Sequence, residues 1–137
     1  MKLLSAKAVK GTFDVLPEEM ERRQYVMDKI SEVYLARGFQ RIETPVLENL
    51  STLTNSDGGE NLRLIFKILK RGEKLVIQDG VTEEDLSDLG LRYDLTLPLS
   101  RFYANNKNEL NKPFKAFQMD KVFRAERNQK GRYRQFM

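Results

Sequence analysis

The sequence predicts an α+β fold in which an antiparallel sheet is flanked by helices. One long segment, 17–36, has apolar residues at helical spacing, whereas 39–43, 89–93 and 114–136 have the composition and alternation typical of strands. The expected order is helix, strands, helix and strands. That order lacks the repeated strand–helix–strand rhythm of a doubly wound fold. We therefore expect residues 1–137 to form one antiparallel or mixed α+β unit.

Composition restricts the possible functions. Hydrophobic residues make up 40% of the 137 residues and charged residues 32%, as in a soluble globular protein. No apolar run approaches the roughly 20 residues that span a bilayer, and the N-terminus lacks a signal-peptide core. We therefore expect a cytoplasmic protein with no membrane contact. Cysteine and histidine are absent, which excludes disulfides, the usual zinc ligands and a Ser-His-Asp triad. We predict no metal site on the protein.

The first helix is expected from Pro17 to Ala36. Proline suits the first position of a helix, and Glu18 and Glu19 in the first turn favour the positive end of the helix dipole. Gly38 is expected to end the helix. Apolar residues at helical spacing predict one buried stripe; they are Met20, Val26, Met27, Ile30, Val33 and Tyr34.

The central strands are predicted from alternation and turn residues. Residues 39–43 alternate, and Pro45 ends that strand because proline cannot donate to the ladder. A further strand is expected from about Ile65. Gly72 lies in a turn-like stretch, so we expect the chain to return along 75–77 as a hairpin.

The next segment begins with an acidic run. Residues 79–88 contain five acidic side chains and no basic one, which indicates a solvated surface insertion. Residues 89–93 resume a strand pattern. A helix follows, with Pro98 just inside it, and the polar residues 105–108 close it.

The last segment, 114–137, is expected to form a strand, a charged loop and a returning strand. From 112 onward the chain has eight Lys or Arg and two Asp or Glu, a net charge of +6, against +4 for the whole chain. Arg124 could offer its planar fork to a phosphate or carboxylate. Glu126 could accept from an amine, and Phe136 could stack on a ring. A solvated basic hairpin and a nonspecific RNA-binding surface remain alternatives.

A second group of polar residues follows the 89–93 strand. Asp94 and Thr96 stand where the strand ends and a helix is about to begin. A carboxylate and a hydroxyl there could recognise an ammonium group. The alternative is a helix cap, in which either side chain accepts from a backbone N–H of the next helix.

Four blocks in order resemble the class II aminoacyl-tRNA synthetases, and among them the histidyl-tRNA synthetases. Residues 38–45 after the long helix look like motif 1 of that class. Residues 123–126 and 131–136, separated by a loop, look like motif 2. The blocks 10–14 and 91–96 narrow the resemblance to the histidine-specific family. Motif 1 would then span about 17–45 and motif 2 about 114–137, within the N-terminal part of the catalytic domain.

The resemblance implies where histidine and ATP would bind. Arg124 matches the catalytic arginine that binds the ATP α-phosphate and the histidine carboxylate. Asp94 and Thr96, with the backbone of Leu95, match the site of the histidine amino group. Around the nucleotide the matching residues are Glu126, Arg132 and Phe136, and Phe136 matches the ring that stacks on adenine.

It also implies partners. The loop that would meet the acceptor end of tRNA(His) comprises Arg127, Asn128, Gln129 and Lys130, and 17–45 would form a homodimer interface. ATP with Mg²⁺ would be the co-substrate. Adenylation by this family uses positioning and electrostatics, so the lack of Cys and His is no obstacle.

The resemblance places motif 3 and the anticodon-binding domain outside these 137 residues. A chain that stops on an arginine-rich strand is expected to be part of a longer protein, and to bind ATP and histidine weakly and aminoacylate poorly by itself. Two alternatives stay open: the related regulatory subunit of ATP phosphoribosyltransferase, and a nucleic-acid-binding module. Arg124, Glu126, Arg132 and Phe136 together favour the ligase.

Overall fold

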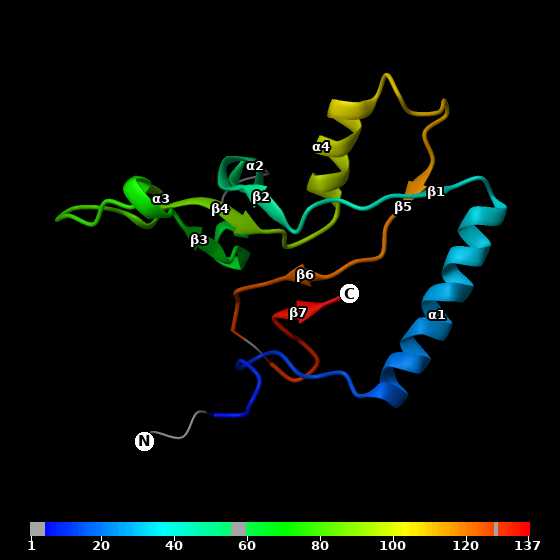
Figure 1. Ribbon diagram of the computed structural model, residues 1–137, viewed down its shortest axis with the longest axis horizontal. Helices are drawn as coiled ribbons and strands as arrows, with labels where there is room; N and C mark the ends of the chain where they lie inside the picture. The colour runs from blue at the N-terminus through cyan, green and yellow to red at the C-terminus, as the bar shows by residue number, and fades with distance from the viewer. Residues whose placement is uncertain (1–4, 56–59, 128) are drawn as a thin grey trace.

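The computed structural model describes residues 5–55, 60–127 and 129–137, and its elements confirm the α+β class (Figure 1). Short 3₁₀ helices occupy Glu60–Leu64 and Gly72–Lys74. The helices are α1 (Pro17–Ala36), α2 (Leu50–Thr54), α3 (Glu83–Leu86) and α4 (Thr96–Asn106). The strands are β1 (Gln40–Arg41), β2 (Leu47–Asn49), β3 (Lys67–Leu69), β4 (Ser87–Leu91), β5 (Ala116–Phe117), β6 (Val122–Phe123) and β7 (Gln135–Phe136).

The described strands form three small sheets. Strands β2, β4 and β3 make an antiparallel sheet in which Leu47 pairs with Leu91 and Lys67 with Gly90. Strands β6 and β7 form the expected C-terminal hairpin, also antiparallel. Strands β1 and β5 pair in parallel, so the sheet structure is mixed. The single strand expected from 114 to 124 is divided between β5 and β6.

The expected hairpin between the 65–69 strand and 75–77 is wrong. Strand β3 pairs with β4 instead, and 70–86 form an arm between the two strands (Figure 1). The physical reason is packing: Gly90 of β4 lies against Leu53 and Ile65 of the core, so this strand pairs with β3. Lys67 forms ion pairs with Glu83 and Glu84 of the arm at 2.9 and 2.8 Å, and a Thr82–Asp85 capping box begins α3. Residues 79–85 are exposed apart from half-buried Val81, as expected of a solvated segment.

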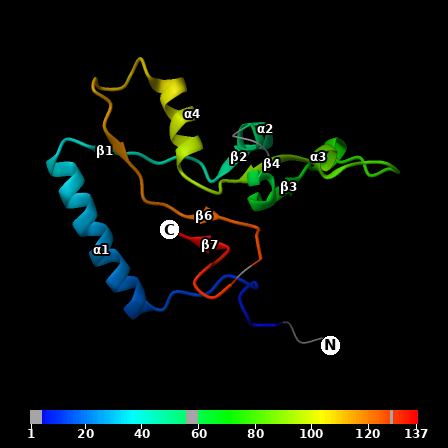
Figure 2. The ribbon, with the colours of Figure 1, turned by 180° about the vertical axis from the view of Figure 1, so that it is seen from behind.

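Helix α1 has the predicted bounds, but the predicted buried stripe is wrong. None of its residues is buried, and Tyr25 is 66% exposed and Val26 53%. The reason is that α1 is anchored mainly at its C-terminal end, where the Tyr34 ring lies 5.0 Å from Phe39 and 5.3 Å from Phe117. Figures 1 and 2 show α1 at the opposite end of the molecule from β3 and α3. No helix in the described ranges is long and apolar enough to cross a membrane.

The compact core lies on the β2–β4–β3 sheet. It is a cluster of Leu50, Leu53, Ile65 and Tyr93, with Leu64 and Leu97 packed against it. Gly90 sits within this packing: a Cβ there would lie 2.8 Å from both Ile65 Cγ2 and Leu53 Cδ1. Beside the core, Glu48, whose side chain is only 3% exposed, pairs with Arg101 of α4 at 2.7 Å.

Candidate functional site

Arg124 is held on the β6–β7 hairpin with its terminal nitrogens available. Its backbone N–H donates to the Arg134 carbonyl at 2.9 Å, and its Nε donates to the Tyr93 carbonyl at 3.3 Å. The guanidinium carbon lies 5.1 Å from the centre of the Phe136 ring, a cation–π distance. Within the described ranges no side chain or carbonyl accepts from Nη1 or Nη2. This half-buried guanidinium is thus fixed by Nε and one face, and its fork can receive an anion.

Asp94 stands one residue before Leu95, the N-cap of helix α4, and its side chain bonds the first turn of that helix. Its Oδ1 accepts from the backbone N–H of Thr96 at 3.1 Å and of Leu97 at 3.3 Å, so the cap interpretation is confirmed. Among the residues that the structure describes, none donates to Oδ2, which leaves one carboxylate oxygen for a cation. Capping and ammonium binding are therefore compatible at this residue. Thr96, the first residue of α4, is exposed.

The two predicted halves of the histidine site meet through the chain between them. Arg124 bonds the carbonyl of Tyr93, the residue that directly precedes Asp94. A guanidinium and a carboxylate on adjoining segments suit a zwitterion, because one half carries a negative charge and the other a positive charge.

The remaining predicted residues extend away along the loop of the hairpin. Glu126 is half-buried, and its backbone carbonyl accepts from Arg134 Nε at 3.2 Å. Arg132 is exposed and pairs with Gln129 through an isolated bridge. The structure thus leaves the nucleotide roles predicted for Glu126 and Arg132 as predictions. Arg127, Gln129 and Lys130 are exposed on the same loop, while Asn128 lies outside the described residues.

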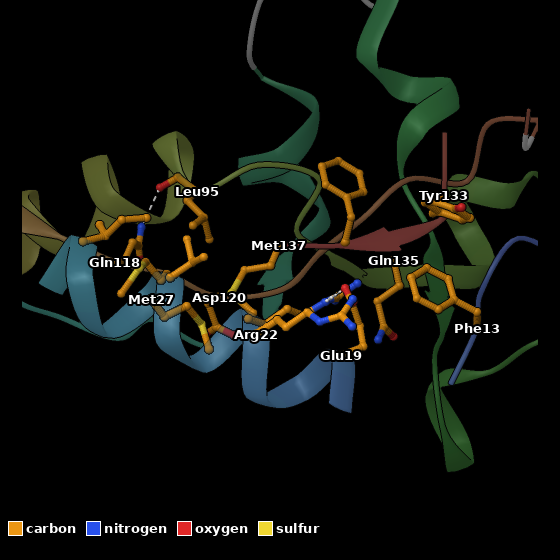
Figure 3. A pocket seen from close by; sticks show the side chains of 15 residues that line it. Phe13, Glu19, Arg22, Met27, Leu95, Gln118, Asp120, Tyr133, Gln135 and Met137 are labelled. Carbon is orange, nitrogen blue, oxygen red and sulfur yellow. Dashed lines mark hydrogen bonds and ion pairs between the residues drawn. The ribbon is translucent and has the colours of Figure 1, made fainter. Parts of the chain in front are cut away.

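A cavity of about 600 Å³ lies between α1 and the hairpin, within the size range of small-molecule sites. Figure 3 shows α1 along one side and β7 along the other, with Phe13 and Tyr133 together at one end. The centres of these two rings are 4.7 Å apart. Phe136 and Leu95 line the cavity, but Arg124 and Asp94 do not. The cavity therefore adjoins the predicted site at two residues rather than containing it.

Arg92 belongs to the block 91–96, but no role was predicted for its side chain. The structure buries it completely, at 0% exposure. Its Nη1 donates to the Thr44 carbonyl at 2.7 Å, and its Nε donates to the Lys121 carbonyl at 2.9 Å. Its Nη2 lies 2.6 Å from Asp120 Oδ2, a distance typical of an ion pair, without the angles of a hydrogen bond. The available signal was an arginine in the middle of the strand-like run 89–93.

Asp120 supplies the negative charge that pairs with the Arg92 guanidinium. Burial by itself would raise the pKa of the Asp120 carboxyl. The Arg92 guanidinium and the backbone N–H of Lys121 outweigh burial and hold that pKa below its ordinary value. Asp120 is therefore the ionised partner of a buried cation at neutral pH.

Comparison with known proteins identifies the family of this sequence. The family model described as histidyl-tRNA synthetase matches residues 11–137. A histidine–tRNA ligase from Azobacteroides pseudotrichonymphae is 47% identical over 93% of this chain and 30% of its own length. The chain spans about 30% of the length of the curated relatives it matches.

Solved structures extend the comparison to the fold. A histidyl-tRNA synthetase from Nostoc sp. PCC 7120 superposes with a TM-score of 0.75 and 32% identity, over 96% of this chain and 27% of that one. A Bacillus halodurans structure described as an ATP phosphoribosyltransferase regulatory subunit/histidyl-tRNA synthetase gives 0.73 at 24% identity, over 98% and 31%, and shows the fold alone. The family match covers nearly the whole sequence, and the chain therefore belongs to the histidyl-tRNA synthetase family.

Proposed function

We propose that this chain supplies one wall of the active site of a histidine–tRNA ligase. In the reaction, a carboxylate oxygen of histidine attacks the α-phosphorus of ATP. The bond from that phosphorus to the bridging oxygen breaks, and histidyl-adenylate and pyrophosphate form. A ribose hydroxyl at the end of tRNA(His) then attacks the histidyl carbonyl, and AMP leaves.

The observation that carries the proposal is the placement of Arg124. Its Nε bonds the Tyr93 carbonyl and its guanidinium carbon lies over the Phe136 ring, so the guanidinium is preorganised before any ligand arrives. A fork held in this way can bind the histidine carboxylate and the α-phosphate together and stabilise the charge that develops on the phosphoryl oxygens. Its contribution is positioning and electrostatics, without a covalent intermediate on the protein.

The amino group of histidine is assigned to the segment after Tyr93. Asp94 keeps Oδ2 available while Oδ1 caps α4, and Thr96 adds an exposed hydroxyl. The Leu95 carbonyl already accepts from Gln118 at 2.9 Å, so we expect it to add its second lone pair at most.

ATP is expected on the hairpin side. Phe136 contacts Arg124 and also borders the cavity beside α1, which makes its ring available for adenine. Glu126 and Arg132 remain the proposed nucleotide contacts, and the loop 127–130 the proposed contact with the acceptor end of tRNA(His). Mg²⁺ would come with the phosphates of ATP as part of the substrate, as is usual for this ion.

Residues 17–45 are proposed as the surface of a homodimer. The support is the apolar side of α1, where Tyr25, Val26, Ile30, Val33 and Tyr34 line a shallow groove with Lys29. Tyr25, Val26 and Val33 are each about half or more exposed, and exposed apolar patches commonly mark interfaces. Sedimentation equilibrium of the purified chain tests this assignment: Val33→Lys should lower the dimer fraction, and an unchanged fraction would contradict it.

The ligase is preferred over the alternatives. The relative compared above is a ligase at 47% identity, whereas the regulatory-type structure shares only the fold. A nucleic-acid-binding module would bind through phosphate contacts, with steep salt dependence and no requirement for histidine.

The test measures ligand affinity by NMR titration of the purified chain with histidine and with MgATP. We expect dissociation constants of about 1 mM or weaker for the unsubstituted chain. Arg124→Gln should weaken both ligands about tenfold, because both lose a charge-assisted fork. Arg71→Gln, a change of another exposed arginine far along the chain, should alter neither. Binding that is insensitive to Arg124→Gln would overturn the proposal.

Catalysis by the isolated chain should be slow. We expect little or no histidine-dependent exchange between ATP and pyrophosphate, since the proposed site includes only one wall. Exchange at a rate typical of whole enzymes, roughly 10 per second, would contradict this part of the proposal.

A further inference from the structure

Arg92 is a buried cation located between the two halves of the proposed histidine site. It directly precedes the segment 93–96, and its backbone carbonyl accepts from the N–H of Phe123 at 3.0 Å, next to Arg124. Burying an arginine is costly unless its donors are bonded. The groups that it bonds therefore indicate what it holds in place.

Every acceptor of the Arg92 side chain belongs to another segment. Nη1 reaches the Thr44 carbonyl at 2.7 Å and Thr44 Oγ1 at 3.2 Å, at the end of the motif 1 strand. Nε bonds the Lys121 carbonyl at 2.9 Å, and Nη2 pairs with Asp120 at 2.6 Å. One planar group thus joins the motif 1 segment, the 92–96 segment and the strand that leads to Arg124.

Gln118 makes a second connection between the same three segments. Its Oε1 accepts from Thr44 Oγ1 at 3.1 Å, and its Nε2 donates to the Leu95 carbonyl at 2.9 Å. Figure 3 marks the bond from Gln118 to Leu95. We call Arg92, Thr44, Gln118 and Asp120 the Arg92 network. Thr44 is 3% exposed and Arg92 0%, so water competes little for these bonds.

We infer that Arg92 is a positioning residue: it fixes the separation between Asp94 and Arg124, so that one histidine molecule can occupy both. The inference rests on the proposed function. An amino acid bridges a carboxylate and a guanidinium only if they stand at the spacing of its ammonium and carboxylate groups. If either Asp94 or Arg124 is displaced slightly, one ligand can no longer bind both, and the affinity gained from binding at two points is lost. Asp94 can then still bind an ammonium group and Arg124 a carboxylate, but separately.

The experiment compares two ligands by NMR titration of the purified chain. Histidine has both groups, whereas histidinol keeps the imidazole and the ammonium and has an alcohol in place of the carboxylate. The unsubstituted chain should bind histidine about tenfold more tightly than histidinol. Arg92→Lys keeps the charge and loses the fork, and it should reduce this ratio to about one by weakening histidine alone.

A matched control is Arg101→Lys. Arg101 is partly buried and bound to a buried carboxylate, that of Glu48. Within the described residues its side chain bonds neither the 93–96 segment nor the hairpin. The Arg101→Lys variant should leave the histidine-to-histidinol affinity ratio near ten. If Arg92→Lys does not fold, Asp120→Asn replaces it, with an expected threefold decrease of the ratio (about 0.7 kcal/mol).

The outcomes separate the two claims. If histidine binds and the ratio stays near ten in the folded Arg92 or Asp120 variant, the inference is overturned and the proposed function stands. Equal weakening of both ligands in a folded variant also leaves the ratio near ten and therefore overturns the inference as well. If the unsubstituted chain binds neither ligand, the proposed function is overturned and the inference falls with it.

Discussion

The two ends of this molecule are built differently. At one end, β2, β3 and β4 with α2 enclose Leu50, Leu53, Ile65 and Tyr93, and a buried Glu48 is paired with Arg101. At the other end, α1 runs for 20 residues without burying one of them, and a cavity of about 600 Å³ separates it from the hairpin. The first end is packed by side chains and the second is anchored at a few points.

The difference shows where the proposed site obtains its rigidity. Asp94 follows the last strand of the packed end, whereas Arg124 and Phe136 belong to the hairpin. Arg92 bonds both regions from a position with no exposure. The proposed chemistry therefore lies at the junction between a packed and an open region, and the predictions below test that contrast.

The largest effect is expected from the packed core. Leu53, 1% exposed, leaves a cavity when it is replaced by alanine. Leu53→Ala should lower the free energy of unfolding by about 4 kcal/mol. Val26→Ala on α1, where the side chain is 53% exposed, should change it by less than about 0.5 kcal/mol. Urea denaturation measures both, and equal losses would contradict the contrast.

The buried ion pair should rank next. Arg101→Met leaves the Glu48 carboxylate, 3% exposed, without its cation, and we expect a loss of about 3 kcal/mol. The double variant Glu48→Leu with Arg101→Met removes the unpaired charge and should recover most of it. If the double variant is as unstable as the single one, the cost is in packing rather than in the charge.

A substitution at Gly90 tests how closely strand β4 packs against Ile65 and Leu53 of the core. A Cβ at this position would meet Ile65 Cγ2 and Leu53 Cδ1 at 2.8 Å, so Gly90→Ala should cost about 2 kcal/mol by overpacking. Pairing Gly90→Ala with Ile65→Leu should restore part of the loss, because leucine has a similar volume but lacks the Cγ2 branch that the new Cβ would meet. Thermal unfolding of the three variants measures this, and an unaffected Gly90→Ala protein would show that the packing is loose.

The smallest effect concerns Asp120 at the junction. Because its folded pKa lies below the ordinary value of about 4, its ion pair stabilises the fold above pH 4, and that contribution disappears as the pH falls through the lower folded pKa. Asp120→Asn should therefore be less stable than the unsubstituted chain by about 1 kcal/mol at pH 7, with the gap closing as the pH falls below the ordinary carboxyl pKa. A gap that does not depend on pH would exclude this cause.

Much of the fold could be predicted because local residues determine it. Pro17 and the apolar spacing fix the bounds of α1, and Gly38, with a φ of 76°, follows its end. The β6–β7 hairpin and α4 were likewise signalled by alternation and by Pro98. The partner of β3 could not be predicted, because it lies far along the chain: Lys67 pairs with Gly90 of β4, on the other side of the 70–86 arm.

The residues of the candidate site also fall into those that local sequence predicts and those that distant contacts determine. Asp94 as a cap follows from its place before a helix, and Arg124 from the charge of the hairpin. The burial of Arg92 depends on Thr44 and Lys121, 48 and 29 residues away, which no local pattern contains. The exposure of α1 was missed because helical periodicity shows that a face is apolar, and not what covers it.

The central claim is that Asp94 and Arg124 act as one site for histidine. The most direct measurement follows the Arg124 Nε–H and the Thr96 backbone N–H in a single NMR titration with histidine. Both groups make hydrogen bonds in the ligand-free structure. The Nε–H resonance therefore reports binding at Arg124, and the Thr96 N–H resonance reports binding at Asp94. We predict that they shift together with one common dissociation constant. Two different constants, or a response at only one of the two groups, would contradict the claim.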